Sequence, residues 1–183
     1  MKLIPALAEE LRRRRKGRVG RSWYVDGTYI KVAGRWSYVY RAIDSSGALV
    51  DLLFREQGDM AAAKALFHSA QAVTGVTPER VTADGHDSYP RAIKTELGHQ
   101  VRHRTSRYRN NGLEQDHRGL KGRYRPMGGF KCPSSAARLC RGHDELRNHL
   151  RPRSHHNQYV SAARRRLQFL RRAVTVLAIL EAA

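Results

Sequence analysis

Residues 23–44, WYVDGTYIKVAGRWSYVYRAID, decide the fold of this 183-residue chain. The stretch holds two runs rich in β-branched and aromatic residues, with Gly34 and Arg35 between them. Such runs on either side of a short glycine-containing break predict two antiparallel strands joined as a hairpin. Residues 48–56, ALVDLLFRE, follow a Ser-Ser-Gly break and have the same character. We therefore predict a three-stranded meander.

The sequence downstream of the meander alternates between helical and strand patterns. Residues 59–74 start with an acidic cap residue, are rich in alanine and predict a helix that ends before Gly75. A short strand before Gly85, a helix over 87–97 and a fifth strand over 99–105 follow. Further helices are predicted over 111–122, 133–150 and 160–182. The order β-β-β-α-β-α-β, followed by helices, indicates an α/β fold.

The chain is strongly basic, with 35 Lys and Arg against 16 Asp and Glu and a formal net charge of +19. Arginines make up 28 of the 35 bases, and the planar guanidinium binds phosphate through a fork. Residues 21–100 contain nine bases and nine acids, whereas residues 101–183 contain nineteen bases and five acids. A GC-rich genome accounts for the preference for arginine over lysine but not for this excess. A neutral body with basic ends indicates a nucleic-acid partner.

The ends of the chain and its cysteines limit the class further. Residues 3–16 predict a short amphipathic helix followed by a solvated basic arm. The longest apolar run, residues 173–180, predicts a packing helix because it is far shorter than the roughly 18 residues of a membrane span. Cys132 and Cys140 make no disulfide framework, and no secretory signal opens the chain. We expect a cytoplasmic location and no membrane partner.

Three carboxylates stand where strand or helix ends can present them together. Asp26 lies within the first predicted strand, Asp84 follows the fourth, and Glu114 lies at the start of a helix. Hard divalent cations such as Mg²⁺ take oxygen ligands and leave positions for substrate phosphate, so this set suggests a metal site for phosphoryl chemistry. Each acid also has an ordinary alternative. Asp26 suits an edge-strand end or bulge, Asp84 an Asx-turn, and Glu114 a capping box with Asn111.

A second metal constellation is a zinc site made of two sulfurs and two nitrogens, from Cys132, Cys140, His143 and His149. Its spacing is poor, because tight structural zinc sites prefer paired ligands two to four residues apart. The carboxylate site is the better hypothesis.

Four blocks of the sequence resemble, in order, the DDE transposases of bacterial insertion sequences, in particular the IS-six family. The blocks are VDGTYIKVAGRWSYVYRAID (25–44), RVTADGHDSYPRAI (80–93), YRNNGLEQDHRGLKGRYRPMGGFK (108–131) and SAARLCRGH (135–143). The family's first Asp lies in a D-E-T-Y-I-K-V strand, matched by Asp26. Its second Asp precedes a turn T-D-x-x-x-x-Y, matched by Asp84 and Tyr89. Its Glu lies in Y-x-N-N-x-x-E-x-D-H-R, matched by Glu114.

This resemblance implies an RNase H-like fold, a five-stranded mixed sheet flanked by helices, with extra helices at the C-terminal end. We expect a basic arm or helix at 1–20, the DDE catalytic domain at 21–150 and a basic helical extension at 151–183. The three acids would hold two Mg²⁺ ions, for which Mn²⁺ would substitute. The implied activity is DNA cleavage and strand transfer at insertion-sequence ends and target DNA, by replicative transposition through a cointegrate. The implied assembly is a homo-oligomer on DNA, in the bacterial cytoplasm at the nucleoid.

Basic residues around the Glu motif are the expected DNA contacts. In the family a basic residue seven positions after the Glu contacts the element's end, and that position is Lys121 here. Seven helical residues span about 10 Å and nearly two turns, which puts Lys121 on the same helix face as Glu114. A solvated surface charge is the alternative for Lys121. The other expected backbone contacts are Arg107, Arg109, Arg118, Arg123 and Arg125.

The chain departs from the family pattern in three ways. Gly27 replaces the Glu of the D-E-T triplet, and the interval from Asp84 to Glu114 is a few residues shorter than usual. Family members have a helix-turn-helix region before the core, and about 22 residues before the first strand do not accommodate one. The favoured hypothesis is a transposase catalytic core. The alternatives are a truncated, non-catalytic DNA-binding remnant and a general RNase H-like nuclease.

Overall fold

The computed structural model describes residues 3–106, 111–152 and 160–182, except for the side chains of residues 3 and 111–116. The elements, in chain order, are α1 (Leu3–Arg13), β1 (Ser22–Val32), β2 (Arg35–Asp44), β3 (Leu49–Arg55), α2 (Met60–Thr74), β4 (Arg80–Ala83), α3 (Ser88–Glu96), β5 (Arg102–Thr105), α4 (Asn111–Tyr124), the 3₁₀ helix η1 (Arg125–Met127), α5 (Pro133–Leu150) and α6 (Ala162–Glu181). The predicted order β-β-β-α-β-α-β is confirmed.

The five strands form one mixed sheet in the order β3-β2-β1-β4-β5. β1, β2 and β3 pair antiparallel, as the meander predicted, while β4 runs parallel to β1 and β5 parallel to β4. The hairpin turn lies at Ala33 and Gly34, one residue earlier than predicted. Both have positive φ, 47° and 81°, as a two-residue turn matched to strand twist requires.

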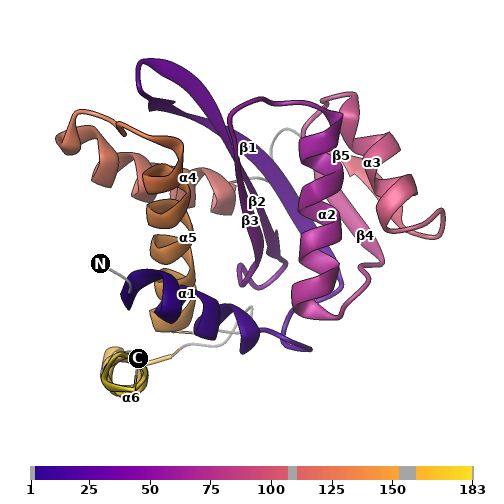
Figure 1. Ribbon diagram of the computed structural model, residues 1–183. Helices are drawn as coiled ribbons and strands as arrows, with labels where there is room; N and C mark the ends of the chain where they lie inside the picture. Colours follow the sequence, from indigo (N-terminus) through magenta and orange to yellow (C-terminus); the bar gives the residue numbers. More distant parts are fainter. Residues whose placement is uncertain (1–2, 107–110, 153–159, 183) are drawn as a thin grey trace.

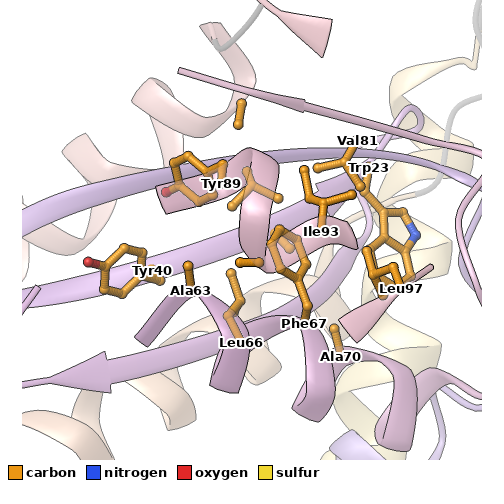
Figure 2. Close-up of a cluster of buried hydrophobic side chains, with 14 of the residues drawn as sticks. Trp23, Tyr40, Ala63, Leu66, Phe67, Ala70, Val81, Tyr89, Ile93 and Leu97 are labelled. Atoms are coloured by element: carbon orange, nitrogen blue, oxygen red, sulfur yellow. The ribbon is translucent and has the colours of Figure 1, made fainter. Parts of the chain in front are cut away.

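One face of the sheet is covered by α2 and α3 (Figure 1). Odd-numbered residues of β1, such as Trp23 and Val25, point to this face because strand side chains alternate. Phe67 of α2 and Ile93 of α3 pack against them, and none of the four is more than 1% exposed. Figure 2 shows Trp23, Phe67 and Ile93 of this cluster between the sheet and the two helices. Alanines on α2 let that helix approach the strands closely.

The other face is covered by α4 and α5, with α1 packed against α5 (Figure 1). Ile30 and Val39 of the sheet pack there with Leu120 of α4 and Cys140 of α5. The fold is therefore a three-layer α/β/α sandwich in which the helix predicted to contain Glu114 lies directly on β1.

The basic run after α1 is not the solvated arm that the sequence predicted. Arg15 is only 4% exposed. Its guanidinium donates to Glu145 of α5 at 2.7 Å and to the carbonyl oxygens of Leu49 and Val50. Two buried acids, Asp51 and Glu145, supply the compensating charge. Two members of the run, Arg12 and Arg15, therefore turn into the protein to meet acids far along the chain, while Arg13, Arg14 and Lys16 stay exposed.

The last helix, α6, lies beyond α1 and α5, away from α2 and α3 (Figure 1). It confirms the helix predicted at 160–182, yet none of its residues is buried. No helix within the described ranges is long and apolar enough to cross a membrane.

Candidate active site

Asp26 and Asp84 lie at the same edge of the sheet. The parallel register of β1 and β4 pairs Tyr24 with Thr82, and each aspartate lies two residues beyond its member of that pair. Side chains two residues apart on a strand point to the same face. Both carboxylates therefore belong to the face covered by α4 and α5, at neighbouring positions on adjacent parallel chains.

The two carboxylates are held by local contacts and remain partly exposed. The Gly27 backbone N–H donates to Asp26 Oδ1 at 2.9 Å. The His86 backbone N–H donates to Asp84 Oδ1 at 3.3 Å, which is the Asx-turn that the sequence offered as the ordinary role of Asp84. A turn contact to one oxygen fixes the direction of the carboxylate and is compatible with a ligand role for it.

The buried side chain of Tyr89 lies close enough to both acids for its pKa to respond to their charges. Burial raises the pKa of Tyr89 most strongly, and the negative charges of Asp84 and Asp26 raise it further. Tyr89 is 2% exposed, so its phenol stays protonated. Asp26 and Asp84 thus lie within electrostatic reach of one side chain, as expected of acids that converge.

Glu114 lies in the first turn of α4, and its side chain is outside the described residues. Three residues later on the same helix, His117 is 6% exposed and its Nε2 lies 3.5 Å from Asp26 Oδ2. Residues three apart share a helix face. The second turn of α4 therefore contacts Asp26 through His117, and convergence of Glu114 with the two aspartates remains a prediction.

His117 is a site residue that sequence reasoning missed. Among the described residues, its Nε2 is a buried polar atom without a hydrogen-bond partner. The available signal was its position, one helical turn after the proposed metal ligand Glu114. The carboxylate that it contacts, Asp26, is on a strand 91 positions earlier in the chain, and only the packing of α4 on β1 brings the two together.

The donor atoms at this edge fit a divalent cation. Asp26 and Asp84 offer carboxylate oxygens, which hard ions such as Mg²⁺ prefer. Within the described side chains, no three His, Cys, Asp or Glu residues are grouped closely enough to hold a metal ion. The two cysteines of the alternative zinc site do not share one location, because Cys140 is buried in the core and Cys132 is exposed.

The predicted DNA contacts are distributed along and after α4. Arg118 and Arg125 are exposed, Lys121 is partly exposed and lies one turn beyond His117, and Arg123 donates to the Gly119 carbonyl oxygen at 3.0 Å. The predicted contacts Arg107 and Arg109 lie outside the described residues.

Arg104 of β5 is a further basic side chain near the acids, which the sequence did not single out. It pairs in register with Thr82, so it points to the face of Thr82 and Asp84, on the neighbouring strand and two residues before the position level with Asp84. Arg104 is exposed. β5 is only four residues long, and its sequence does not predict which of its side chains share the face of Asp84.

Gly27, which stands where the family has Glu, points to the face of the sheet opposite Asp26. Gly27 pairs with Tyr40, and a Cβ at position 27 would lie 3.4 Å from the Tyr40 ring. Because side chains alternate along β1, residue 27 points away from the face of Asp26. Loss of the family's Glu here therefore leaves the acidic edge intact.

Solved structures place this fold in a known class. The HTLV-2 integrase catalytic core domain, in its trimeric form with magnesium, superposes with a TM-score of 0.53 at 14% identity, over 78% of this chain and 93% of that one. A chain of the simian T-cell lymphotropic virus intasome superposes with a TM-score of 0.50 at 15% identity, over 81% and 64%. The sheet order and these neighbours define an RNase H-like fold of the integrase-core type.

Sequence comparison identifies the family. The DDE-domain model of the IS240 transposase family matches residues 20–153. The chain belongs to this family of DDE transposases, as its motifs predicted.

Curated relatives include two Staphylococcus aureus proteins. These are the transposase for the insertion sequence-like element IS431mec of strain Mu50 and the transposase for IS257 in transposon Tn4003. Each is 40% identical over 103 residues, which is 54% of this chain and 46% of the relative. The chain spans about half the length of these curated relatives.

Proposed function

We propose that this chain is the catalytic core of an insertion-sequence transposase that cuts DNA and joins the resulting end to a target. One observation supports this most directly. Asp26 and Asp84 each lie two residues beyond Tyr24–Thr82, the last pair of two parallel strands in an RNase H-like sheet, and α4, which contains Glu114, contacts Asp26 through His117. Family membership and the names of the transposase relatives give the reaction class.

The reaction exchanges one phosphorus–oxygen bond for another at each step. Water attacks a phosphodiester at the element's end, and the departing oxygen becomes a 3′-hydroxyl. That hydroxyl attacks a target phosphodiester and releases a target 3′-oxygen. Neither step consumes an outside energy source, and in-line positioning supplies much of the acceleration.

Two Mg²⁺ ions, or Mn²⁺ in their place, are the cofactors proposed for Asp26, Asp84 and Glu114, and magnesium is named with the HTLV-2 integrase core. Bound there, such ions activate water and neutralise phosphate oxygens. The protein's own part is to orient the ligands. The Gly27 N–H fixes one oxygen of Asp26, and His117 lies against the other.

The substrate proposed for this edge is double-stranded DNA, as insertion-sequence ends and target. The cations proposed to serve it are exposed Arg118 and partly exposed Lys121 on α4, the helix that contacts Asp26, and exposed Arg104 on β5, the strand beside β4. Guanidinium and ammonium groups hold the flanking phosphates while the acids act on the central one. A homo-oligomer on DNA would bring two ends to one target.

The test uses the full chain with supercoiled plasmid and a labelled duplex that ends in a 3′-hydroxyl, in Mg²⁺ or Mn²⁺. We expect cleavage and joining by the wild type. Asp84→Asn should abolish both while salt-sensitive binding remains. Asp87→Asn is the matched control, because Asp87 is exposed three residues away and its side chain makes no cap hydrogen bond.

Other outcomes would overturn the proposal. Metal-independent binding with no turnover by the wild type would identify a non-catalytic remnant. Cleavage without joining would identify a nuclease of the same fold.

A further inference from the structure

The two sides of α6 (Ala162–Glu181) differ in exposure. Its partly buried residues are mixed in character, with polar Gln168, Arg172 and Thr175 and apolar Ala173, Val176, Ile179 and Leu180. Arg172 donates to the carbonyl oxygen of His149 at 3.0 Å and to that of Arg151, while the His149 ring donates back to the Arg172 carbonyl at 3.3 Å. The helix is thus attached to α5 largely through polar contacts.

The outward side of α6 is an apolar seam, defined as Leu167, Leu170, Val174 and Leu177. These side chains are 48%, 59%, 64% and 57% exposed. At 100° per residue, the seam lies on the side of the helix opposite Gln168, Thr175 and Ile179. An amphipathic surface helix normally buries its apolar side against its own domain. Here the apolar side faces out, which indicates a partner surface.

The spacing of the seam is that of a coiled coil. Its members are separated by three, four and three residues, which are the a and d positions of a heptad repeat. Side chains at these positions insert between those of a facing helix. The geometry therefore requires a second helix with a matching stripe.

We propose that the seam pairs with the same seam of a second copy of this chain, with the two helices antiparallel. A two-fold contact of this kind needs one self-complementary surface. Antiparallel pairing sets Leu167 against Leu177 of the partner subunit and Leu170 against Val174 of the partner subunit. The contact goes beyond the proposed catalytic function and does not depend on it.

The charges of α6 favour this orientation. Arg164, Arg165 and Arg166 gather at its start, while Glu181, its acidic residue, lies at its end. Parallel pairing would set one arginine cluster beside the other, at a cost in repulsion. Antiparallel pairing sets each cluster beside the neutral end and Glu181 of the other copy.

DNA is a poorer occupant for the same surface. The seam itself contains no cation, and phosphate binding requires cations facing the backbone. Arg172, near the middle of the helix, points the other way and donates to the carbonyl oxygens of His149 in α5 and of Arg151 just after it. An apolar stripe with heptad spacing is better matched by an identical stripe.

The first test measures the mass of the full chain in solution by sedimentation over a concentration series, without DNA. We expect wild type to be a dimer and Leu170→Glu to weaken dimerisation by about 100-fold or more, because pairing would bury an unpaired carboxylate. Phe169→Glu is the matched control, since Phe169 is 46% exposed on the same helix and lies about 100° away from Leu170. It should dimerise like wild type.

Because α6 has no buried residue, both variants should keep the wild-type circular dichroism spectrum. A monomeric wild type at every concentration, or a Leu170→Glu protein that dimerises like wild type, would overturn the proposal.

The second test establishes orientation by disulfide trapping in a Cys132→Ser background, where the remaining native thiol, Cys140, is buried. Leu167→Cys protein should not cross-link with itself, but should cross-link when mixed with Leu177→Cys protein. Self-cross-linking of Leu167→Cys would show parallel helices and contradict the antiparallel pairing.

Discussion

Asp26 and His117 form the contact that joins α4 to the acidic edge of the sheet. The imidazole is 6% exposed, and its Nε2 lies 3.5 Å from Asp26 Oδ2. A buried ring at that distance limits the rotamers open to the carboxylate. It also sets the position of the first turn of α4, where Glu114 lies. His117 is therefore a positioning residue for the proposed metal ligands.

His117→Gln should lower DNA cleavage and joining by about 10- to 100-fold, the usual effect of removing a group that orients a metal ligand. The affinity for DNA should stay within about twofold, since His117 is buried and contacts no phosphate. Turnover and binding are measured on the same labelled duplex. His103→Gln is the control, because His103 is a partly buried histidine on the other face of the sheet. Equal losses in both variants would point to general destabilisation.

The residues of the site differ in how far the sequence could predict them. The shared location of Asp26 and Asp84 was predictable because Asp26 lies within a local strand pattern, Asp84 follows another, and adjacent parallel strands bring such positions to one edge. His117 was not, since a histidine within a helix has no local signal for a carboxylate 91 residues away. Arg104 required the register of β5, which sequence patterns do not give.

At the scale of elements, α1 is held to the sheet and to α5 by a buried charge cluster of Arg12, Arg15, Asp51 and Glu145. Arg12 contacts Asp51 at 3.2 Å, and Arg15 contacts Glu145 at 2.7 Å. Buried pairs of this kind contribute little net stability but are costly to break, because the remaining charge loses its partner. The cluster therefore specifies where α1 docks more than it stabilises the fold.

Glu145→Gln should flatten the dependence of stability on pH. Burial raises the pKa of Glu145 from 4.5 to about 7, partly opposed by Arg15. Between those pH values the folded state holds a proton that the unfolded chain releases, so this group's contribution is full below pH 4.5 and is lost as pH rises through about 7. Glutamine cannot ionise but can still accept from Arg15.

The measurement is the melting temperature from pH 5 to 8. As the pH rises across this range, the melting temperature of the wild type should fall further than that of Glu145→Gln. Glu79→Gln, at a side chain 72% exposed, should follow wild type. Identical slopes for wild type and Glu145→Gln would show that Glu145 is already ionised in the folded state at low pH.

Helices and strands were more predictable from the sequence than the burial of the residues in and beside them. The strand order in the chain followed from alternation and turn residues, as in 23–44, because these signals are local. The burial of Arg15 in the basic run at 12–16 could not be predicted from local signals, because it depends on Asp51 and Glu145, which are distant in sequence. The apolar run at 173–180 predicted a helix correctly, but not that part of its apolar surface would face solvent.

At the scale of the whole molecule, the net charge of +19 overstates the cations that DNA can reach. Arg15 and Arg41 are buried against Glu145 and Asp144, on the inner side of α5. Such guanidiniums hold helices in place and do not contact phosphate. The accessible cations near the acidic edge are the ones that should set the salt dependence of binding.

Arg118→Ala combined with Lys121→Ala should therefore reduce the slope of log binding constant against log salt by about two, one for each lost phosphate contact. The loss should be similar for unrelated duplex sequences, because backbone contacts do not read bases. Fluorescence anisotropy of a labelled duplex across a salt series measures it. The double variant Arg91→Ala, Lys94→Ala removes two exposed cations from α3, on the other face of the sheet, and should keep the wild-type slope. If the α3 variant lowers the slope and the α4 variant does not, DNA crosses the opposite face.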